Sequence, residues 1–162
     1  MPIARKHRLP LECYRGRVAV AFTACLRFAD GARLDDESAA LFQTKLTDGA
    51  TRFGCAVEVW CLMPDHLHVI LTGRTDDADT WRAMVDFKQQ TGYWLAQNRP
   101  AIVWQKDFYD HVIRSDESLD VQARYVIENP VRAGLVTDWT AYPWTGGEVV
   151  DAFRADAVGD AG

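Results

Sequence analysis

Apolar residues change their spacing several times along the chain, and four stretches have the composition of strands. Residues 18–28 form an apolar, partly β-branched run that predicts a buried strand. Residues 55–63 and 66–72 predict two more strands, separated by Pro64, which cannot donate a ladder hydrogen bond. Residues 102–114 predict a fourth extended segment.

Three stretches have apolar residues at helical spacing instead. The first begins at Asp36 with acidic capping residues and ends before Gly54. The second covers residues 80–97 and carries a mainly apolar stripe. The third covers residues 115–129, and we expect Pro130 to end it.

The resulting order of strands and helices, βαββαβα, is that of the ferredoxin-like split βαβ arrangement. We therefore predict an α+β fold with an antiparallel sheet, helices on one face, and an extra C-terminal helix. Residues 1–150 are expected to form a single domain that starts with a basic N-terminal arm, residues 1–17. The acidic, small-residue segment 151–162 is expected to be a flexible tail.

Composition narrows the class of protein. The 162 residues are 48% hydrophobic and 11% aromatic, which excludes disorder throughout the chain and supplies a core for one domain. The longest apolar run is about half a membrane span, and the first residues do not resemble a signal peptide, so we expect a soluble, cytoplasmic protein without a membrane partner. Its four cysteines have no CxxC spacing and are expected to be reduced thiols.

Charge is unevenly distributed. The net charge of −5 argues against a general polyanion binder. Residues 1–34, however, carry seven Lys and Arg against two acidic residues. Phosphate binding needs local rather than total positive charge, so this segment is either a DNA-binding arm or an ordinary solvated surface.

The most informative local feature is His66-Leu67-His68. Residues i and i+2 of a strand point to the same face, so both imidazoles project together and form half of a metal site. The alternative is a pair of surface histidines on an exposed sheet face. Glu58 on the preceding strand would lie near the same face, in a row with Trp60 and Leu62.

The last predicted helix offers the other groups that such a site needs. Tyr125 and Asn129 are four residues apart and therefore share a helical face. A tyrosine hydroxyl, with its ordinary pKa of about 10, becomes an effective nucleophile only toward an activated electrophile. From these residues alone, a core aromatic at Tyr125 and an ordinary helix end at Asn129 are the favoured interpretations.

Taken together, these motifs resemble a known family. Residues 61–71, CLMPDHLHVIL, resemble the His-hydrophobic-His (HUH) motif of the single-tyrosine, IS200-like transposases, and residues 125–136, YVIENPVRAGLV, resemble their catalytic helix. Residues 104–114 and 142–146 are similar to segments of the REP-associated tyrosine transposases, one branch of that family. The four motifs occur in the same order over most of the chain.

The resemblance implies a metal-dependent endonuclease and strand transferase acting on single-stranded DNA, often beside a hairpin. His66, His68 and Asn129 would bind Mg²⁺ or Mn²⁺, and Tyr125 would be the nucleophile that forms a 5′-phosphotyrosine intermediate. That linkage conserves bond energy, so strands can be rejoined without ATP, as DNA transposition and recombination require. The protein would act as a monomer or a homodimer.

Other residues are expected to support this site. Eight basic side chains are candidate DNA contacts, four from the N-terminal arm and four flanking the site: Arg5, Lys6, Arg8, Arg15, Lys88, Arg114, Arg124 and Arg132. His111 is expected to form a hydrogen bond near Tyr125, and Glu58 is a possible supporting carboxylate.

Two other functions remain open at this stage. The first is a domesticated DNA-binding protein in which Tyr125 has no chemical role. The second is a small metallohydrolase in which His66, His68 and Glu58 hold a metal-activated water.

Overall fold

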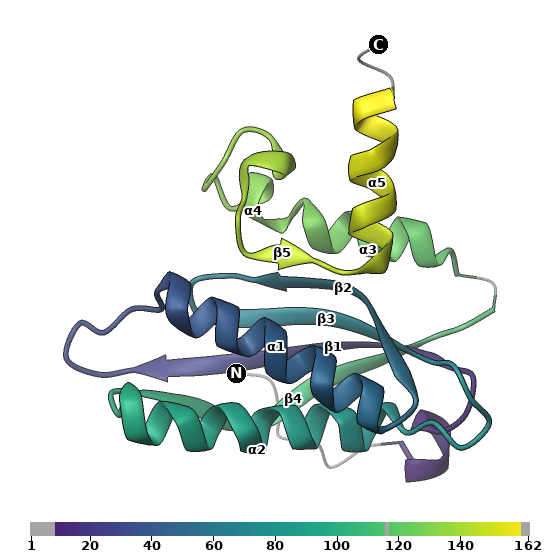
Figure 1. The fold of residues 1–162 in the computed structure, drawn as a ribbon, viewed down its shortest axis with the longest axis horizontal. Helices are drawn as coiled ribbons and strands as arrows, with labels where there is room; N and C mark the ends of the chain where they lie inside the picture. The colour runs from purple at the N-terminus through teal and green to yellow at the C-terminus, as the bar shows by residue number, and fades with distance from the viewer. Residues whose placement is uncertain (1–8, 116, 160–162) are drawn as a thin grey trace.

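One antiparallel sheet of five strands, in the order β4-β1-β3-β2-β5, runs through the computed structural model, which describes residues 9–115 and 117–159 (Figure 1). The strands are β1 (Ala19–Phe28), β2 (Cys55–Leu62), β3 (His66–Gly73), β4 (Ile102–Ile113) and β5 (Thr145–Gly146). Each pair of neighbours is antiparallel, which confirms the predicted sheet. The short β5 pairs with β2 and has no counterpart in the prediction.

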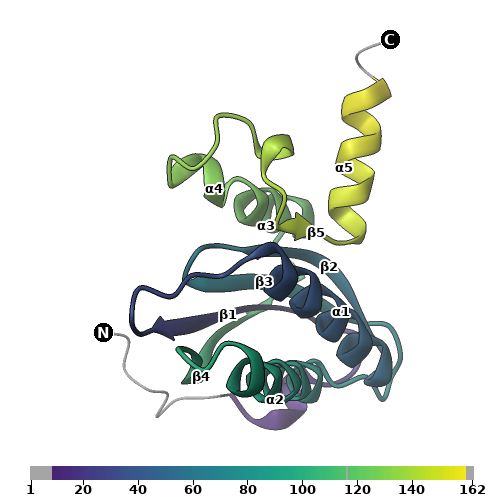
Figure 2. The ribbon, with the colours of Figure 1, turned by 60° about the vertical axis from the view of Figure 1, so that its left-hand side comes forward.

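Two long helices, α1 (Asp36–Arg52) and α2 (Thr80–Asn98), are the predicted pair that covers one face of the sheet (Figure 2). Asp35 starts α1 by accepting a hydrogen bond from the Ser38 backbone N–H, and Asp79 starts α2 in the same way. These carboxylates satisfy backbone donors that the first helical turn leaves without partners. Gly54, at a φ of +72°, lets the chain reverse after α1 into β2.

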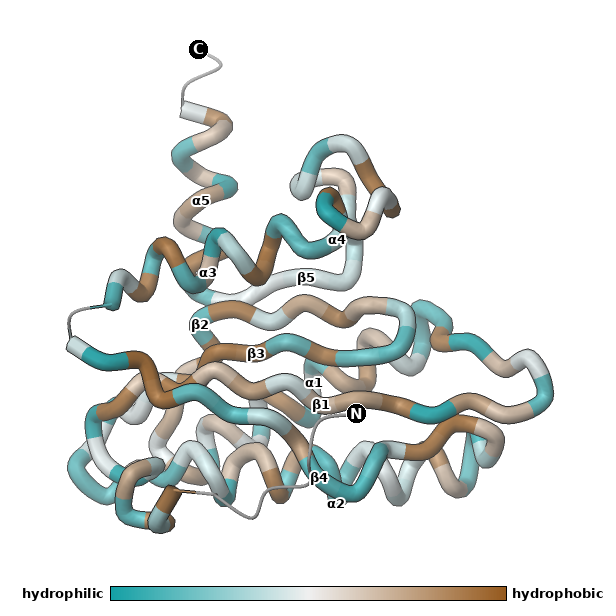
Figure 3. Tube along the Cα trace, turned by 180° about the vertical axis from the view of Figure 1, so that it is seen from behind, coloured by the Kyte–Doolittle hydropathy of each residue, from teal (hydrophilic) through white to brown (hydrophobic). Residues whose placement is uncertain are grey.

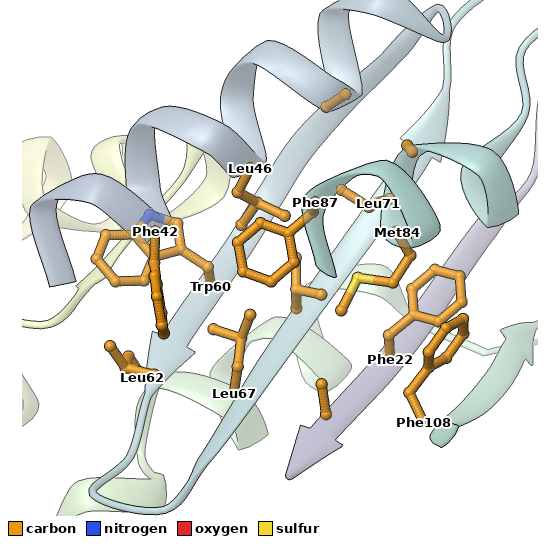
Figure 4. Close-up of a cluster of buried hydrophobic side chains, with 14 of the residues drawn as sticks. Phe22, Phe42, Leu46, Trp60, Leu62, Leu67, Leu71, Met84, Phe87 and Phe108 are labelled. Carbon is orange, nitrogen blue, oxygen red and sulfur yellow. The ribbon is translucent and has the colours of Figure 1, made fainter. Parts of the chain in front are cut away.

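The main core lies between the sheet and these two helices (Figure 4). Leu67 and Leu71 of β3 point into it, as does Phe22 of β1. Phe42 of α1 and Phe87 of α2 meet there edge to face, with ring centroids 5.9 Å apart. Leu67 therefore faces the helices, so that its neighbours in the sequence face the other side of the sheet.

The opposite face carries a second, smaller core that includes residues of α3 (Leu119–Ile127) and α5 (Glu148–Gly159). Figure 3 shows these two helices next to β5 and β2. Val59 of β2 and Ile70 of β3 are fully buried there against Ile127 of α3. The extra helix that carries Tyr125 thus lies on the face opposite α1 and α2, and it is not the last helix of the chain.

Helix α3 ends earlier than predicted. Ser118 caps its start, and its last residue is Ile127; Pro130 stands instead in the first turn of a short helix, α4 (Asn129–Arg132). Proline is tolerated in a first turn because its missing N–H has no helical partner there. A 3₁₀ turn (Trp139–Ala141) then leads into β5, as a similar turn (Leu11–Tyr14) precedes β1.

The prediction of a flexible tail from residue 151 is wrong for residues 151–159, which belong to α5. Val149, Val150 and Phe153 recur at helical spacing and pack against the second core, which gives this short helix an apolar face. Arg74 fixes its start by donating to Glu148 at 2.7 Å.

The predicted row of Glu58, Trp60 and Leu62 is also wrong, because β2 contains a bulge. Its register against β3 shifts between Val57 and Val59, so Glu58 is the extra residue. Trp60 and Leu62 consequently face α1 and α2, whereas the Glu58 carboxylate faces the other side. No helix within the described residues is long and apolar enough to cross a membrane.

Candidate metal and tyrosine site

Two imidazole nitrogens converge at the start of β3. The Nε2 atoms of His66 and His68 lie 3.0 Å apart, and the two rings are perpendicular, with centroids separated by 4.7 Å. Both side chains project from the sheet face opposite α1 and α2, as their i, i+2 spacing predicts. A rigid, paired strand thus fixes two potential metal ligands side by side.

The other nitrogen of each ring has a hydrogen-bond partner. The Nδ1 atom of His66 lies 2.7 Å from an Asp65 carboxylate oxygen, and that of His68 lies 3.0 Å from the Thr23 hydroxyl oxygen. Thr23 is the residue directly opposite His68 on β1. Such partners fix the orientation of a ligating imidazole and favour a proton on Nδ1, which frees the Nε2 lone pair.

Burial lowers the pKa of His68 from 6.5 to about 4, with smaller contributions from His66 and from the positive charge of Arg132. The ring is therefore neutral near pH 7. Neutral imidazole is the form that coordinates metals, so His68 is held in its binding form.

The spacing of the pair fits a divalent cation. Two ligands about 2.1 Å from a metal and at right angles to each other are about 3.0 Å apart. Within residues 9–115 and 117–159, no three His, Cys, Asp or Glu side chains are grouped as a metal site. A third protein ligand would have to be of another type, such as the amide oxygen of Asn129.

Tyr125 lies on the outer surface of α3, and the residue is 62% exposed. Its ring is not part of either core, which excludes the interpretation of Tyr125 as a packing residue. The guanidinium of Arg132 lies over that ring, 3.8 Å from its centroid. The ring is therefore exposed to solvent and has the guanidinium of Arg132 over one of its faces.

Arg132 also joins Tyr125 to Asn129. Its Nη2 group donates to the Tyr125 carbonyl oxygen at 2.6 Å and to the Asn129 side-chain oxygen at 2.8 Å. Sequence reasoning assigned Arg132 only as a DNA contact and missed this role. Arg132 is three residues after Asn129 and seven after Tyr125, which is about one and two helical turns. This spacing could have indicated the contacts.

A groove of about 710 Å³ lies beside His66. His66 and Asp65 line it from the turn before β3, and Ala133 and Leu135 line it from the segment after α4. Its other lining residues are mostly apolar: Phe28, Ala32, Arg33, Leu34, Met63, Pro64 and Trp144. The segment that follows Arg132 therefore shares this groove with His66.

Glu58 does not join the histidines. Its side chain is 8% exposed and accepts hydrogen bonds from Thr72 at 2.7 Å and from Arg74 at 2.5 Å. Thr72 is four residues beyond His68 on β3, two steps farther along the same face. The ligand set of the metallohydrolase hypothesis is thus not formed, because Thr72 and Arg74 hold the Glu58 carboxylate farther along the sheet from the histidine pair.

His111 likewise has a different partner from the predicted one. Its Nε2 atom lies 2.8 Å from the Glu117 carboxylate, which also accepts from the Arg114 backbone N–H at 3.1 Å. These hydrogen bonds lower the pKa of Glu117. They join the end of β4 to the start of α3, so His111 supports the fold near the tyrosine helix rather than the tyrosine itself.

Several predicted DNA contacts have partners within the chain. Arg15 pairs with Asp79 at 3.4 Å, and Arg124 stacks over the Phe153 ring at 4.1 Å. Lys88 donates to backbone carbonyl oxygens of β4, the nearest that of Gln105 at 2.8 Å. Arg5, Lys6 and Arg8 lie outside the described residues. Of the eight basic candidates, Arg132 is the one for which the structure shows contacts with Tyr125 within the described residues.

Comparisons of the sequence with known proteins all find transposases. The family described as "Transposase IS200 like" matches residues 31–129. A REP-associated tyrosine transposase of Escherichia coli K12 is 29% identical over 92 residues, which cover 55% of this chain and 52% of that protein. A relative from Haemophilus influenzae is 28% identical over 93 residues, 49% of this chain and 53% of its own. The chain thus spans about half the length of these curated relatives.

The fold has a solved counterpart. A structure described as the REP-associated tyrosine transposase bound to a REP hairpin superposes with a TM-score of 0.71. It is 22% identical, and the match covers 88% of this chain and 82% of that chain. This likeness extends the sequence match from residues 31–129 to most of the architecture.

Proposed function

This chain belongs to the IS200-like transposase family, and we propose that it cuts and rejoins single-stranded DNA through Tyr125. One observation carries the proposal. Two imidazole nitrogens converge at 3.0 Å on the same side of the sheet as an exposed tyrosine, and Arg132 connects that tyrosine to an amide oxygen. These are the parts that a metal-assisted tyrosine nuclease needs.

The reaction proceeds by displacement at phosphorus. The Tyr125 phenol oxygen forms a bond to the scissile phosphorus as the bond to the 3′-oxygen breaks. The phenol proton passes to solvent and the leaving 3′-oxygen takes one up, so that no net proton is consumed. The products are a 5′-phosphotyrosine and a free 3′-hydroxyl, and attack by a 3′-hydroxyl on the phosphotyrosine rejoins a strand without ATP.

His66, His68 and Asn129 would hold the divalent cation of this reaction. When bound, Mg²⁺ or Mn²⁺ supplies Lewis-acid polarisation of the scissile phosphate. The protein contributes the orientation: Asp65 and Thr23 fix the imidazoles, and burial keeps His68 neutral.

The proposed substrate is single-stranded DNA next to a hairpin. The solved relative is described in complex with a REP hairpin, and this chain shares its fold. The groove beside His66, with apolar and aromatic lining residues such as Phe28 and Trp144, suits unpaired bases. The exposed position of Tyr125 suits an extended strand better than a small molecule.

The decisive experiment incubates the protein and Mn²⁺ with labelled single strands from hairpin repeats of its own genome. We expect a covalent adduct that peptide mass spectrometry maps to Tyr125. Tyr125→Phe should abolish the adduct and retain DNA binding, whereas Tyr93→Phe, at another exposed tyrosine on α2, should leave it unchanged. An adduct on another residue overturns the assignment, and hairpin binding without any adduct identifies a non-catalytic DNA-binding protein.

A further inference from the structure

Arg132 makes three contacts with the two residues assigned to chemistry on α3 and α4. Its Nη2 group has two N–H bonds, and they are directed to two acceptors, the Tyr125 carbonyl oxygen at 2.6 Å and the Asn129 side-chain oxygen at 2.8 Å. The flat face of the same guanidinium lies 3.8 Å from the centroid of the Tyr125 ring. One side chain therefore fixes both a ring plane and an amide orientation.

We propose that Arg132 is a positioning residue that holds the Tyr125 ring and the Asn129 side-chain oxygen in their working orientations before DNA binds. This inference rests on the proposed function and deepens it. The phenol of an exposed side chain and a terminal amide both rotate freely in solvent, and fixing them in advance removes an entropic cost from the reaction. Asn129 keeps a second lone pair on its oxygen for a cation.

A lysine at this position would not give the same arrangement. A guanidinium is planar and presents several N–H groups at fixed angles while stacking on an aromatic face, whereas an ammonium is a flexible point charge. Arg132→Lys therefore keeps the charge and removes the geometry. That makes it the informative substitution.

Charge alone does not account for an arginine at this place. The guanidinium of Arg132 lies 2.8 Å from the Asn129 side-chain oxygen, and its positive charge would repel a cation held by that oxygen. A residue present only for its charge would thus weaken metal binding. The hydrogen bonds to Asn129 and Tyr125 are a benefit that offsets this repulsion.

Metal binding gives the first test and does not depend on catalysis. Mn²⁺ affinity is measured by electron paramagnetic resonance for the wild type, Arg132→Lys, Asn129→Ala and the double variant. We expect Arg132→Lys to weaken binding by about 10-fold, as loss of a residue that orients a ligand does, and to have no further effect once Asn129 is alanine. The proposal is overturned if Arg132→Lys weakens Mn²⁺ binding equally in the wild type and in Asn129→Ala. It is also overturned if Arg132→Lys does not weaken Mn²⁺ binding in the wild type.

Cleavage kinetics give the second test. A positioning role predicts that Arg132→Lys lowers kcat by at least about 10-fold and changes KM by less than about 2-fold. A raised KM with unchanged kcat would show a plain phosphate contact and overturn the proposal. Arg154→Lys is the matched control, because Arg154 also stacks on an aromatic ring, that of Trp139 at 5.3 Å, but belongs to α5. If the wild type forms no tyrosine adduct, the proposed function fails. The Mn²⁺ affinities of the wild type, the two single variants and the double variant still test the role of Arg132.

Discussion

The Nε2 atoms of His66 and His68 lie 3.0 Å apart, while the Nδ1 atoms of the same rings are hydrogen-bonded to Asp65 and Thr23. Two neutral nitrogen lone pairs at this separation repel each other unless a proton or a cation lies between them. Strand pairing and the two hydrogen bonds hold the two nitrogens where one proton or one cation can lie between them. The pair is therefore organised to bind before any ligand arrives.

Removing either ring should abolish this binding. His66→Ala and His68→Ala each delete one of two nitrogen ligands, and we expect Mn²⁺ affinity to fall by at least about 100-fold, since loss of an orienting partner alone costs 10- to 100-fold. Isothermal titration calorimetry with MnCl₂ measures this directly. His111→Ala is the matched control, because His111 contacts Glu117 and not the pair. Unchanged affinity in both site variants would mean that the metal binds elsewhere.

The Thr23 hydroxyl allows a finer test of the same site. Thr23→Val keeps the shape of the side chain and removes the oxygen that partners His68 Nδ1 at 3.0 Å. We expect Mn²⁺ affinity to fall by about 10-fold, because the ring loses its fixed orientation. Thr23→Ser retains the hydroxyl and should bind nearly as the wild type does. A serine variant as weak as the valine variant would contradict the role of the hydroxyl.

Much of the fold could be predicted from the sequence, because its local signals agree with one another. The apolar run of β1, the Asp35 and Gly54 boundaries of α1, and the alternation around His66 and His68 all follow from spacing and turn chemistry. The convergence of the two imidazoles follows from the period of a strand. Local geometry was sufficient for these features.

The features that the sequence did not predict depend on contacts between distant segments or on a bulge that shifts the alternation of side chains along a strand. The β2 bulge at Glu58 reverses which side chains face α1, and the sequence around it carries no proline or glycine to signal it. Helix α5 owes its place to the second core and to Arg74, neither of which the segment 151–162 specifies. The pairing of His111 with Glu117 depends on how the chain turns between β4 and α3.

The low pKa of His68 predicts a specific dependence of stability on pH. The unfolded side chain takes up a proton near pH 6.5, whereas the folded one stays neutral down to about pH 4. The unfolded state thus binds more protons between these values, so the free energy of unfolding should decrease as pH falls from 6.5 to 4. Above pH 6.5 His68 is neutral in both states, so it no longer makes the free energy of unfolding depend on pH.

Urea unfolding at intervals of pH, in the presence of EDTA, measures that dependence. One proton changes the free energy of unfolding by at most about 1.4 kcal/mol per pH unit. His68→Asn should remove part of the slope between pH 6.5 and 4. Identical slopes in the two proteins would show that His68 is not held neutral by the fold.

Tyr142 connects the segment after α4 to the end of β2, close to the histidine turn. It is 7% exposed, and its hydroxyl donates to the carbonyl oxygen of Leu62. The backbone N–H of Leu62 donates in turn to the carbonyl oxygen of Trp144 at 2.8 Å. This connection holds the segment that follows α4 against the end of β2.

Tyr142→Phe should therefore destabilise the protein by about 1–3 kcal/mol, because it leaves the buried Leu62 carbonyl without its side-chain donor and keeps the ring. Urea unfolding at pH 7 measures the change, with Tyr93→Phe as control because Tyr93 is 68% exposed. Since the hydroxyl holds the segment that follows α4, Mn²⁺ affinity should also fall in Tyr142→Phe, and by less than in Asn129→Ala. Lost stability with unchanged Mn²⁺ affinity would show that α4 keeps its place without this hydrogen bond.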